Sequence, residues 1–194
     1  VIIRFFDETN LFQLDGLYFE NDESGIIYNS IGVNSATFDH YLNKEKLMKQ
    51  ISYLNPDLII ISLGTNDSYN KEVDKTKFLT TVNKFITTIK ENNANAELLF
   101  TIPADNSIKK TTTHYKFVKN KKGKKVKQAY TKTSIKNNDQ IPVVKDVLID
   151  YALKNNIAYW DFYTVMGGKN SMAKWVKIQL QIQTIFTLNE TDIY

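Results

Sequence analysis

Apolar positions recur along the chain at two different spacings, and their alternation predicts the fold class. Over residues 37–53 and 74–91 they return every three or four residues, which is typical of amphipathic helices. Between them, residues 57–63 (DLIIISL) form a continuous apolar run, typical of a strand covered on both faces. The remaining elements are predicted at 98–102 (strand), 142–155 (helix), 157–161 (strand) and 171–177 (helix). Strand and helix alternate, so the pattern predicts an α/β domain with a mostly parallel, doubly wound sheet.

The first thirty residues do not follow this rhythm. Residues 1–6 (VIIRFF) and 11–20 are predicted strands joined by a polar turn, and residues 25–30 (GIIYNS) are a further predicted strand. Two strands joined by a short turn are typical of a hairpin from a separate all-β module. We therefore divide the chain into the end of a β-module at 1–24, an α/β domain at 25–177 and an atypical tail at 178–194.

Composition narrows the chemistry. The chain has no cysteine, which excludes disulfides, thiolate metal sites and a cysteine nucleophile. With only His40 and His114, it is not expected to hold a multi-histidine metal site, and each histidine is expected to be a surface or packing residue. No apolar run approaches the length that crosses a membrane. We expect neither a metal nor an organic cofactor.

The net charge of +4 is concentrated in one lysine-rich segment, Lys109–Lys136. Alternation on both sides of Lys122-Gly123 predicts an extended hairpin. Such a segment is either a solvated loop or a surface that attracts an anionic polymer, such as a cell-wall glycan or a surface phosphate. Nucleic acid is not the predicted partner, because base recognition commonly uses arginine and this segment has none.

Ligands of open α/β sheets bind beyond the carboxyl ends of the strands. Three predicted loops lie there, at residues 32–36, 64–67 and 161–168. In the second, a glycine allows a sharp turn, after which Asn66 can present its side-chain amide to a developing oxyanion. Two simpler roles remain open: Asn66 as a turn residue that caps the next helix, and Asp67 as a structural residue that holds the loop through backbone hydrogen bonds.

The motif Asn34-Ser35-Ala36 followed by PDLIIISLGTND resembles the second and third conserved blocks of SGNH/GDSL hydrolases. The resemblance implies a three-layer α/β/α sandwich of the flavodoxin-like type and a serine ester hydrolase activity. In that family, a loop glycine donates a backbone N–H, and an asparagine donates a side-chain N–H, to one oxyanion hole. Carried over by position, Asn66 is the side-chain donor, Ser35 is the backbone donor at a position where the family usually has glycine, and Gly32 is the turn residue before it.

The stretch IPVVKDVLIDYALKNNIAYWDFYTVMGG looks most like a bacterial subgroup of this family. These members carry an inserted β-sandwich similar to a carbohydrate-binding module, and they resemble exported esterases that remove O-acetyl groups from peptidoglycan or other polysaccharides. The resemblance implies an acylated glycan substrate and a periplasmic or cell-surface location. Gly64, Trp160, Asp161 and Tyr163 are candidate substrate-binding residues, although the three from the last predicted loop fit a place in the core as well.

Two motifs of the family are absent from these 194 residues: the Gly-Asp-Ser nucleophile block and the carboxy-terminal Asp-x-x-His. We hypothesise that the first lies upstream of Val1. A frameshift near Lys177 would account for the second, because the codons of residues 183–194, moved back by one base, permit such a motif. The chain would then be inactive by itself and would lack the strand expected beside 57–63. The alternatives are a non-catalytic glycan-binding remnant and, less favoured because no glycine-rich phosphate loop follows a strand, a nucleotide-binding domain.

Overall fold

The computed structural model describes residues 23–70, 72–119 and 123–178, and the chain forms two compact units, Val1–Gly32 and Val33–Tyr194. The strand predicted at 25–30 is wrong: residues 26–33 have no regular structure, and Ile26 is 97% exposed. No neighbouring strand in the described residues offers this segment backbone partners. The strands predicted at 1–6 and 11–20, and all but the first residue of the tail, lie outside the described residues, and the predicted boundary after residue 24 stays a prediction.

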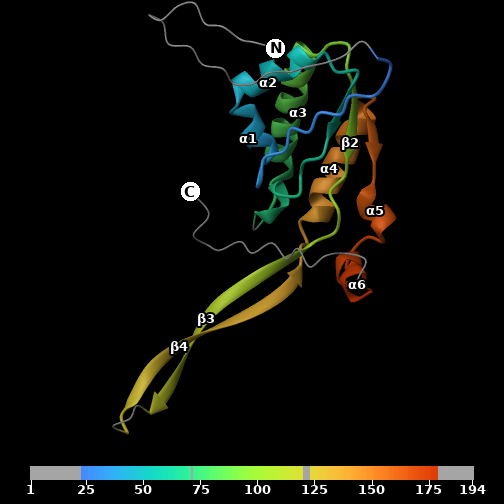
Figure 1. Ribbon diagram of the computed structural model, residues 1–194. Helices are drawn as coiled ribbons and strands as arrows, with labels where there is room; N and C mark the ends of the chain where they lie inside the picture. The colour runs from blue at the N-terminus through green and yellow to red at the C-terminus, as the bar shows by residue number, and fades with distance from the viewer. Residues whose placement is uncertain (1–22, 71, 120–122, 179–194) are drawn as a thin grey trace, which may run out of the picture. The chain divides into compact units, whose positions relative to one another are not determined.

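The second unit is built on a parallel sheet. Its strands β1 (Leu58–Ile61), β2 (Glu97–Thr101) and β5 (Ala158–Trp160) lie in the order β1-β2-β5. Figure 1 labels the central strand β2. Ile59 pairs with Leu98, and Phe100 pairs with Tyr159. Parallel neighbours need a crossover, and helices supply it in the chain between these strands. The predicted α/β class with a mostly parallel sheet is confirmed.

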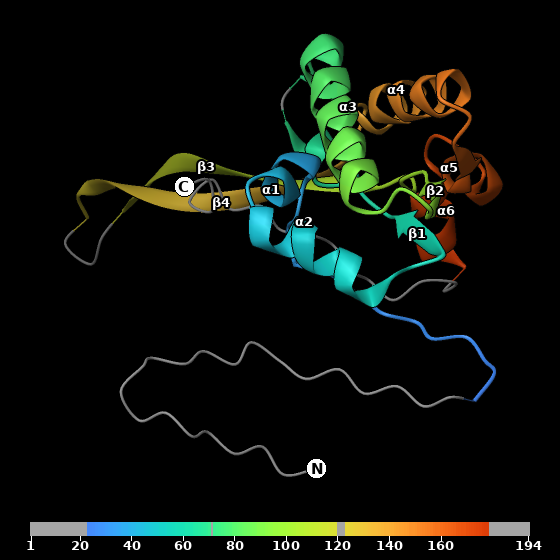
Figure 2. The ribbon, with the colours of Figure 1, turned by 90° about the horizontal axis from the view of Figure 1, so that it is seen from above.

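Two long helices, α3 (Lys75–Asn92) and α4 (Ile141–Lys154), pack side by side in both views (Figures 1 and 2). Asp74 caps the amino-terminal end of α3. Its carboxylate accepts a hydrogen bond from the Lys77 backbone N–H at 3.0 Å, one of the N–H groups that have no partner within the helix. The five α3 residues with helical spacing that the pattern assigns to one side are all buried: Phe78, Val82, Phe85, Ile86 and Ile89. The Tyr151 ring of α4 contacts the Phe100 ring edge-on, which places α4 over the face of β2 that carries Phe100.

The apolar strand β1 is less covered than its sequence predicts. Among the described residues it pairs only with β2, and Leu58 and Ile60 are 50% and 48% exposed. Residues two apart on a strand share a face, so both side chains lie on the face opposite Ile61, which is buried. The prediction that residues 57–63 are covered on both faces is therefore wrong for the described part of the chain.

The single helix predicted over 37–53 is divided into α1 (Phe38–Leu42), α2 (Glu45–Ile51) and the 3-10 turn η1 (Ser52–Leu54). The break falls at Asn43 and Lys44, whose backbone angles are not helical. The Asn43 amide bonds back to the Asp39 carboxylate at 3.2 Å, a local bond of the kind by which asparagine competes with helix continuation. α1 is held against α3 by Phe38, whose ring meets those of Phe78 and Phe85 edge-on at 5.7 and 5.2 Å.

The predicted lysine-rich hairpin is confirmed as β3 (Ser107–Lys119) and β4 (Lys125–Asn137), paired antiparallel over their whole length. Gly123 in its turn has φ +74°, a conformation that favours glycine. Three short helices complete the described fold: η2 (Asp67–Tyr69), α5 (Phe162–Met166) and α6 (Ser171–Lys177). In the described residues, no helix is both long and apolar enough to cross a membrane.

Candidate active site

The end of β1 is fixed by Gly64. Its φ is +110°, and a Cβ atom at this position would lie 2.9 Å from both Pro103 Cγ and Val144 Cγ1. Real Cβ atoms do not approach other atoms so closely, and L side chains rarely adopt this φ. The backbone therefore turns at the end of β1 while pressed against the segment after β2 and against α4. This contact sets the direction in which residues 65–67 leave the sheet.

The Asn66 side chain joins two loops that are 30 residues apart in the sequence. Its Nδ2 donates a hydrogen bond to the Ala36 carbonyl oxygen at 2.8 Å, so residues 34–36 and 64–67 meet as the family resemblance predicts. The side chain is partly buried rather than enclosed in packed protein. An amide nitrogen carries two hydrogens, and no described residue accepts the second one from Asn66. The site thus retains a side-chain donor.

The opposite loop turns at Asn34 and Ser35. The Ala36 N–H closes this turn on the Val33 carbonyl at 3.2 Å, and Ser35 has φ +62°. At a positive φ, a residue with a Cβ atom is strained and glycine is not. This is the physical reason to expect glycine at position 35. Gly32 is not the turn residue that the sequence predicts: its φ is not positive and a Cβ there would contact nothing, so the turn falls on Asn34 and Ser35 instead.

Asp67 connects this loop to the start of α1. Its Oδ1 accepts a hydrogen bond from the Phe38 backbone N–H at 3.3 Å, and only 8% of the residue is exposed. Burial raises the pKa of the Asp67 carboxyl to about 6, against the opposing effect of backbone N–H groups, Phe38 first, and of the nearby His40. His40 itself belongs to the cap of α1, where its Nδ1 pairs with Thr37 Oγ1 at 3.0 Å. Both residues therefore have a structural role here, as predicted.

A buried network that the sequence pattern does not single out supports the Asn66 loop. Ser68 Oγ donates to the Thr65 carbonyl at 2.5 Å and accepts from Asn138 Nδ2 at 2.8 Å. Asn138, fully buried, also accepts from the Gln140 backbone N–H at 3.0 Å through its Oδ1. The network ties the loop to the base of β4 and to the start of α4. Its only sequence signal is the polar cluster Asn137-Asn138-Asp139-Gln140 before a helix, which reads equally well as a helix start.

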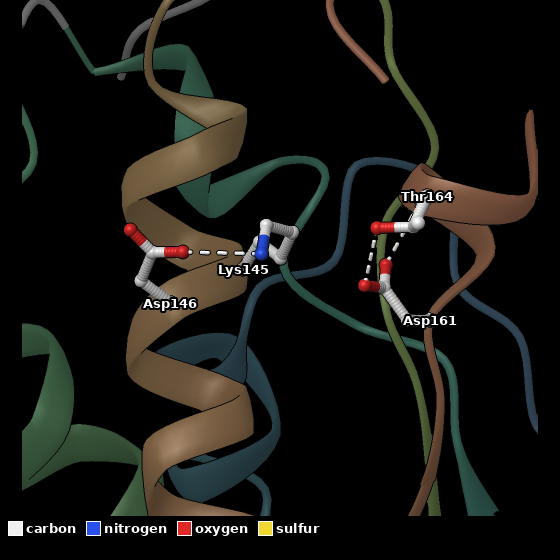
Figure 3. A network of polar contacts seen from close by, with 4 residues as sticks. All are labelled: Lys145, Asp146, Asp161 and Thr164. Carbon is white, nitrogen blue, oxygen red and sulfur yellow. Dashed lines mark hydrogen bonds and ion pairs between the residues drawn. The ribbon is translucent and has the colours of Figure 1, made fainter. Parts of the chain in front are cut away.

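The segment 161–168, predicted as a loop, is largely the helix α5. Asp161 caps it: its Oδ1 accepts from the Thr164 backbone N–H at 3.0 Å and its Oδ2 from the Thr164 hydroxyl at 2.5 Å (Figure 3). Figure 3 also shows the Lys145–Asp146 ion pair on α4, with 3.2 Å between Nζ and Oδ1. The Asp161 carboxylate is thus engaged within its own helix, because an aspartate before a helix satisfies the first free N–H groups.

The two aromatic candidates of this segment differ in exposure. Trp160 is 48% exposed and stacks on the Phe162 ring at 4.9 Å, whereas Tyr163 is buried. Burial raises the pKa of the Tyr163 phenol. Trp160 therefore keeps ring surface that a ligand can reach, and Tyr163 does not. No hydrogen bond in the described part of the chain joins either residue to Asn66.

Two other kinds of site are relevant in the described part of the chain, a metal-ion cluster and a surface hollow. The described residues contain no group of three or more histidine, aspartate or glutamate side chains that could hold a metal ion. A hollow of about 440 Å³ between α1 and α3 is lined by residues such as Asp39, Lys77 and Thr80. It shares no residue with the three loops and is a surface groove between packed helices.

The family profile described as GDSL-like lipase/acylhydrolase matches residues 18–181. No curated protein sequence matches the chain. Among solved structures, a peptidoglycan O-acetylesterase is similar with a TM-score of 0.59 and 17% identity, over 80% of this chain and 39% of that one. This chain thus spans about two fifths of that structure.

Two further solved structures are similar to this chain at lower scores. An acetyl xylan esterase has a TM-score of 0.49 and 18% identity, over 83% of this chain and 72% of that one. The periplasmic domain of a lipopolysaccharide acetyltransferase from Salmonella ser. Paratyphi A has a TM-score of 0.42 and 17% identity, over 66% and 47%. At these scores neither carries an argument about this chain.

Proposed function

The chain belongs to the family of GDSL-like lipases and acylhydrolases, and we propose that it removes O-acetyl groups from a bacterial polysaccharide by serine acyl-enzyme chemistry. The observation that carries the proposal is the hydrogen bond from Asn66 Nδ2 to the Ala36 carbonyl. It joins the loop of Asn66 to the loop of Ser35, and this contact supports the proposal that the Asn66 amide and the Ser35 backbone N–H serve one oxyanion beyond the carboxyl end of β1.

Each of the two donors has a defined task. When a nucleophile attacks an ester carbonyl, negative charge develops on the carbonyl oxygen, and donors held in place in advance stabilise it. Asn66 supplies an uncharged N–H whose position is fixed by the bond to Ala36 and by the turn at Gly64. Ser35 supplies a backbone N–H whose direction follows from its positive φ. No metal ion or organic cofactor enters this scheme.

The proposal assigns the oxyanion half of the site to these 194 residues. Their sequence contains neither Gly-Asp-Ser nor Asp-x-x-His, so the serine nucleophile and its histidine base are proposed to come from additional sequence. In the resulting reaction, the serine oxygen forms a bond to the acyl carbon and the sugar oxygen leaves with a proton from histidine. Water then releases acetate and restores the serine.

The first test compares three versions of the protein on acetylated polysaccharide and on a chromogenic acetate ester. These are the chain as given, the chain extended upstream in its gene, and the extended chain with the reading frame after Lys177 shifted by one base. Acetate release only in a longer version is the expected result. No release by any version would leave a glycan-binding protein without chemistry, and release by the chain as given would refute the assignment of the nucleophile.

The second test removes the side-chain donor in the active version. Asn66→Ala should lower kcat by about 10²–10³, the cost of losing one such donor, with a smaller change in KM. Ser35→Gly is the matched control, because it keeps the backbone N–H and removes the Cβ atom that is strained at φ +62°. This variant should retain the full activity. An Asn66→Ala enzyme as fast as the wild type would refute the oxyanion role.

The proposed location of the protein in the cell follows from the proposed substrate class. A polysaccharide O-acetylesterase works where the polymer lies, so we propose that this protein acts in the periplasm or at the cell surface. Fractionation of the producing cell tests this directly: recovery of the protein with the cytosol alone would contradict it.

A further inference from the structure

The β3–β4 hairpin carries the strongest charge separation of the molecule. Residues 107–137 contain 11 of the chain's 25 basic side chains, all of them lysine, and none of its 21 acidic ones. The rest of the sequence therefore carries 14 basic and 21 acidic side chains, a net charge of −7. Residues 25–106 and 138–177, the rest of the α/β domain, hold 13 basic and 13 acidic side chains, so a strongly cationic hairpin is carried by a domain that is otherwise neutral. From this arrangement we infer that the hairpin is a docking arm for an anionic polysaccharide.

The lysines are distributed over both faces of the arm. The one-to-one register places alternate residues on opposite faces. One face carries Lys110, Lys116, Lys132 and Lys136, and the other carries Lys109, Lys119, Lys125 and Lys127. Thirteen residues per strand extend roughly 40 Å at about 3.4 Å per residue. A polyanion meets attracting charge along the whole length of the arm, on either side.

The same distribution argues against a lipid surface. A ribbon that lies on a bilayer needs its apolar side chains on one face, so that the other remains in water. Here the exposed apolar residues are divided: Tyr115 and Phe117 lie on one face, and Val126 and Tyr130 lie on the other. Neither face can be buried in lipid without burying lysines as well. A flexible chain that wraps the arm does not meet this restriction.

The aromatic rings favour a glycan over a nucleic acid. Single strands are held by bases stacked on exposed aromatic faces. In this arm, Lys127 Nζ lies 4.1 Å from the centre of the Tyr115 ring, and the Tyr130 ring is stacked on His114 at 5.6 Å. Each of these two tyrosine rings thus has one face in contact with a side chain of the arm. Around them the arm carries lysine ammonium groups, tyrosine hydroxyls and a row of threonine hydroxyls, a set that matches repeated anions on a polyhydroxylated polymer.

The base of the arm is joined to the candidate active site. Asn138 follows β4 directly, and its amide donates to Ser68 Oγ, two residues after Asn66. Before β3, the buried Asp105 accepts a hydrogen bond from the Met172 backbone N–H at 3.0 Å and so holds the other leg to α6. A polymer that binds the arm and continues past its base therefore reaches the candidate site with the ester groups at that end. The choice of a glycan as the polyanion rests on the proposed function. The attraction of the lysines for a polyanion does not depend on it.

The test is a binding measurement, which needs no hydrolysis. Polygalacturonate, a polysaccharide with one carboxylate per sugar, is titrated against the chain by calorimetry at low salt. The first variant changes Lys109, Lys119, Lys125 and Lys127 to Gln; the control changes Lys75, Lys77, Lys84 and Lys90 of α3, all exposed, to Gln. Both variants remove four charges. Circular dichroism and thermal unfolding establish that both are folded.

The expected result is a loss of about tenfold or more in affinity for the hairpin variant and about twofold or less for the α3 control, with binding that weakens as salt rises. Equal losses would overturn the inference, since the polymer would then respond only to net charge. Tighter binding, at equal anion concentration, to an oligothymidylate or to phosphatidylglycerol vesicles would overturn it in favour of another partner. Failure of Asn66→Ala to affect hydrolysis would refute the proposed activity and leave these affinities unchanged.

Discussion

Gly64 permits a sharp test of how the site is held, because two unfavourable effects of a side chain coincide there. Gly64→Ala places a residue with Cβ at φ +110°, which costs about 1–2 kcal/mol. The new methyl group would also lie 2.9 Å from Pro103 Cγ and Val144 Cγ1. Relieving such overpacking costs about 1–3 kcal/mol more. The free energy of unfolding should therefore fall by about 2–5 kcal/mol.

Gly167 offers a matched control. It has the same φ of +110°, but a Cβ there would meet only Ser171 Cβ at 3.4 Å, an ordinary contact. Gly167→Ala should then cost the backbone part alone, about 1–2 kcal/mol. Urea unfolding followed by the fluorescence of the two tryptophans measures both variants, and an unchanged m-value shows that the denatured state is comparable. If the two variants lost the same free energy, the close approach at Gly64 would have no energetic role, and the argument for how Asn66 is positioned would fail.

Three further predictions concern stability and association. The pKa of the Asp67 carboxyl is about 6 in the folded state against 3.8 for the ordinary group, so the folded state binds the proton more tightly than the unfolded state. The resulting stabilisation of roughly 3 kcal/mol is present below about pH 4 and lost by about pH 7. Asp67→Asn should remove this pH dependence of the free energy of unfolding. Parallel pH–stability curves for the two proteins would contradict it. Asn138→Ala leaves Ser68 and Gln140 without their partner and should cost about 2–3 kcal/mol in urea unfolding, against a few tenths for exposed Asn92→Ala. Ile60→Thr should reduce self-association, measured by light scattering at high protein concentration, because Ile60 is half-exposed on the open strand β1. Unchanged scattering would contradict a role of this strand in self-association.

The elements that the sequence predicts correctly are those whose signals are local. The apolar stripe of α3 and the glycine turn of the hairpin both depend on residues close together in the chain. For the site, the Gly64–Asn66 turn is predicted from the same kind of signal. Its meeting with residues 34–36 came from the resemblance to a family, since no local pattern links positions 30 residues apart.

The predictions that failed depend on what surrounds a segment. Residues 25–30 have the composition of a strand, but a strand forms only where a neighbour supplies hydrogen bonds, and none of the described residues does. Residues 57–63 are apolar enough for a buried strand, yet burial depends on what covers each face. Asn43 interrupts the helix of 37–53 through a side-chain bond that periodicity does not register. The network around Asn138 was missed because each of its members is unremarkable in sequence and only their meeting is informative.

The open edge of β1 bears on how firmly the Asn66 loop is held. Among the described residues, the strand that ends in this loop is hydrogen-bonded on one side only, so its amide protons should exchange with deuterium faster than those of β2, which has a neighbour on each side. Any chain that pairs along the free edge would slow this local opening. It would thereby narrow the range of positions available to the Asn66 amide, and assembly of the sheet would become a way of preparing the oxyanion donor.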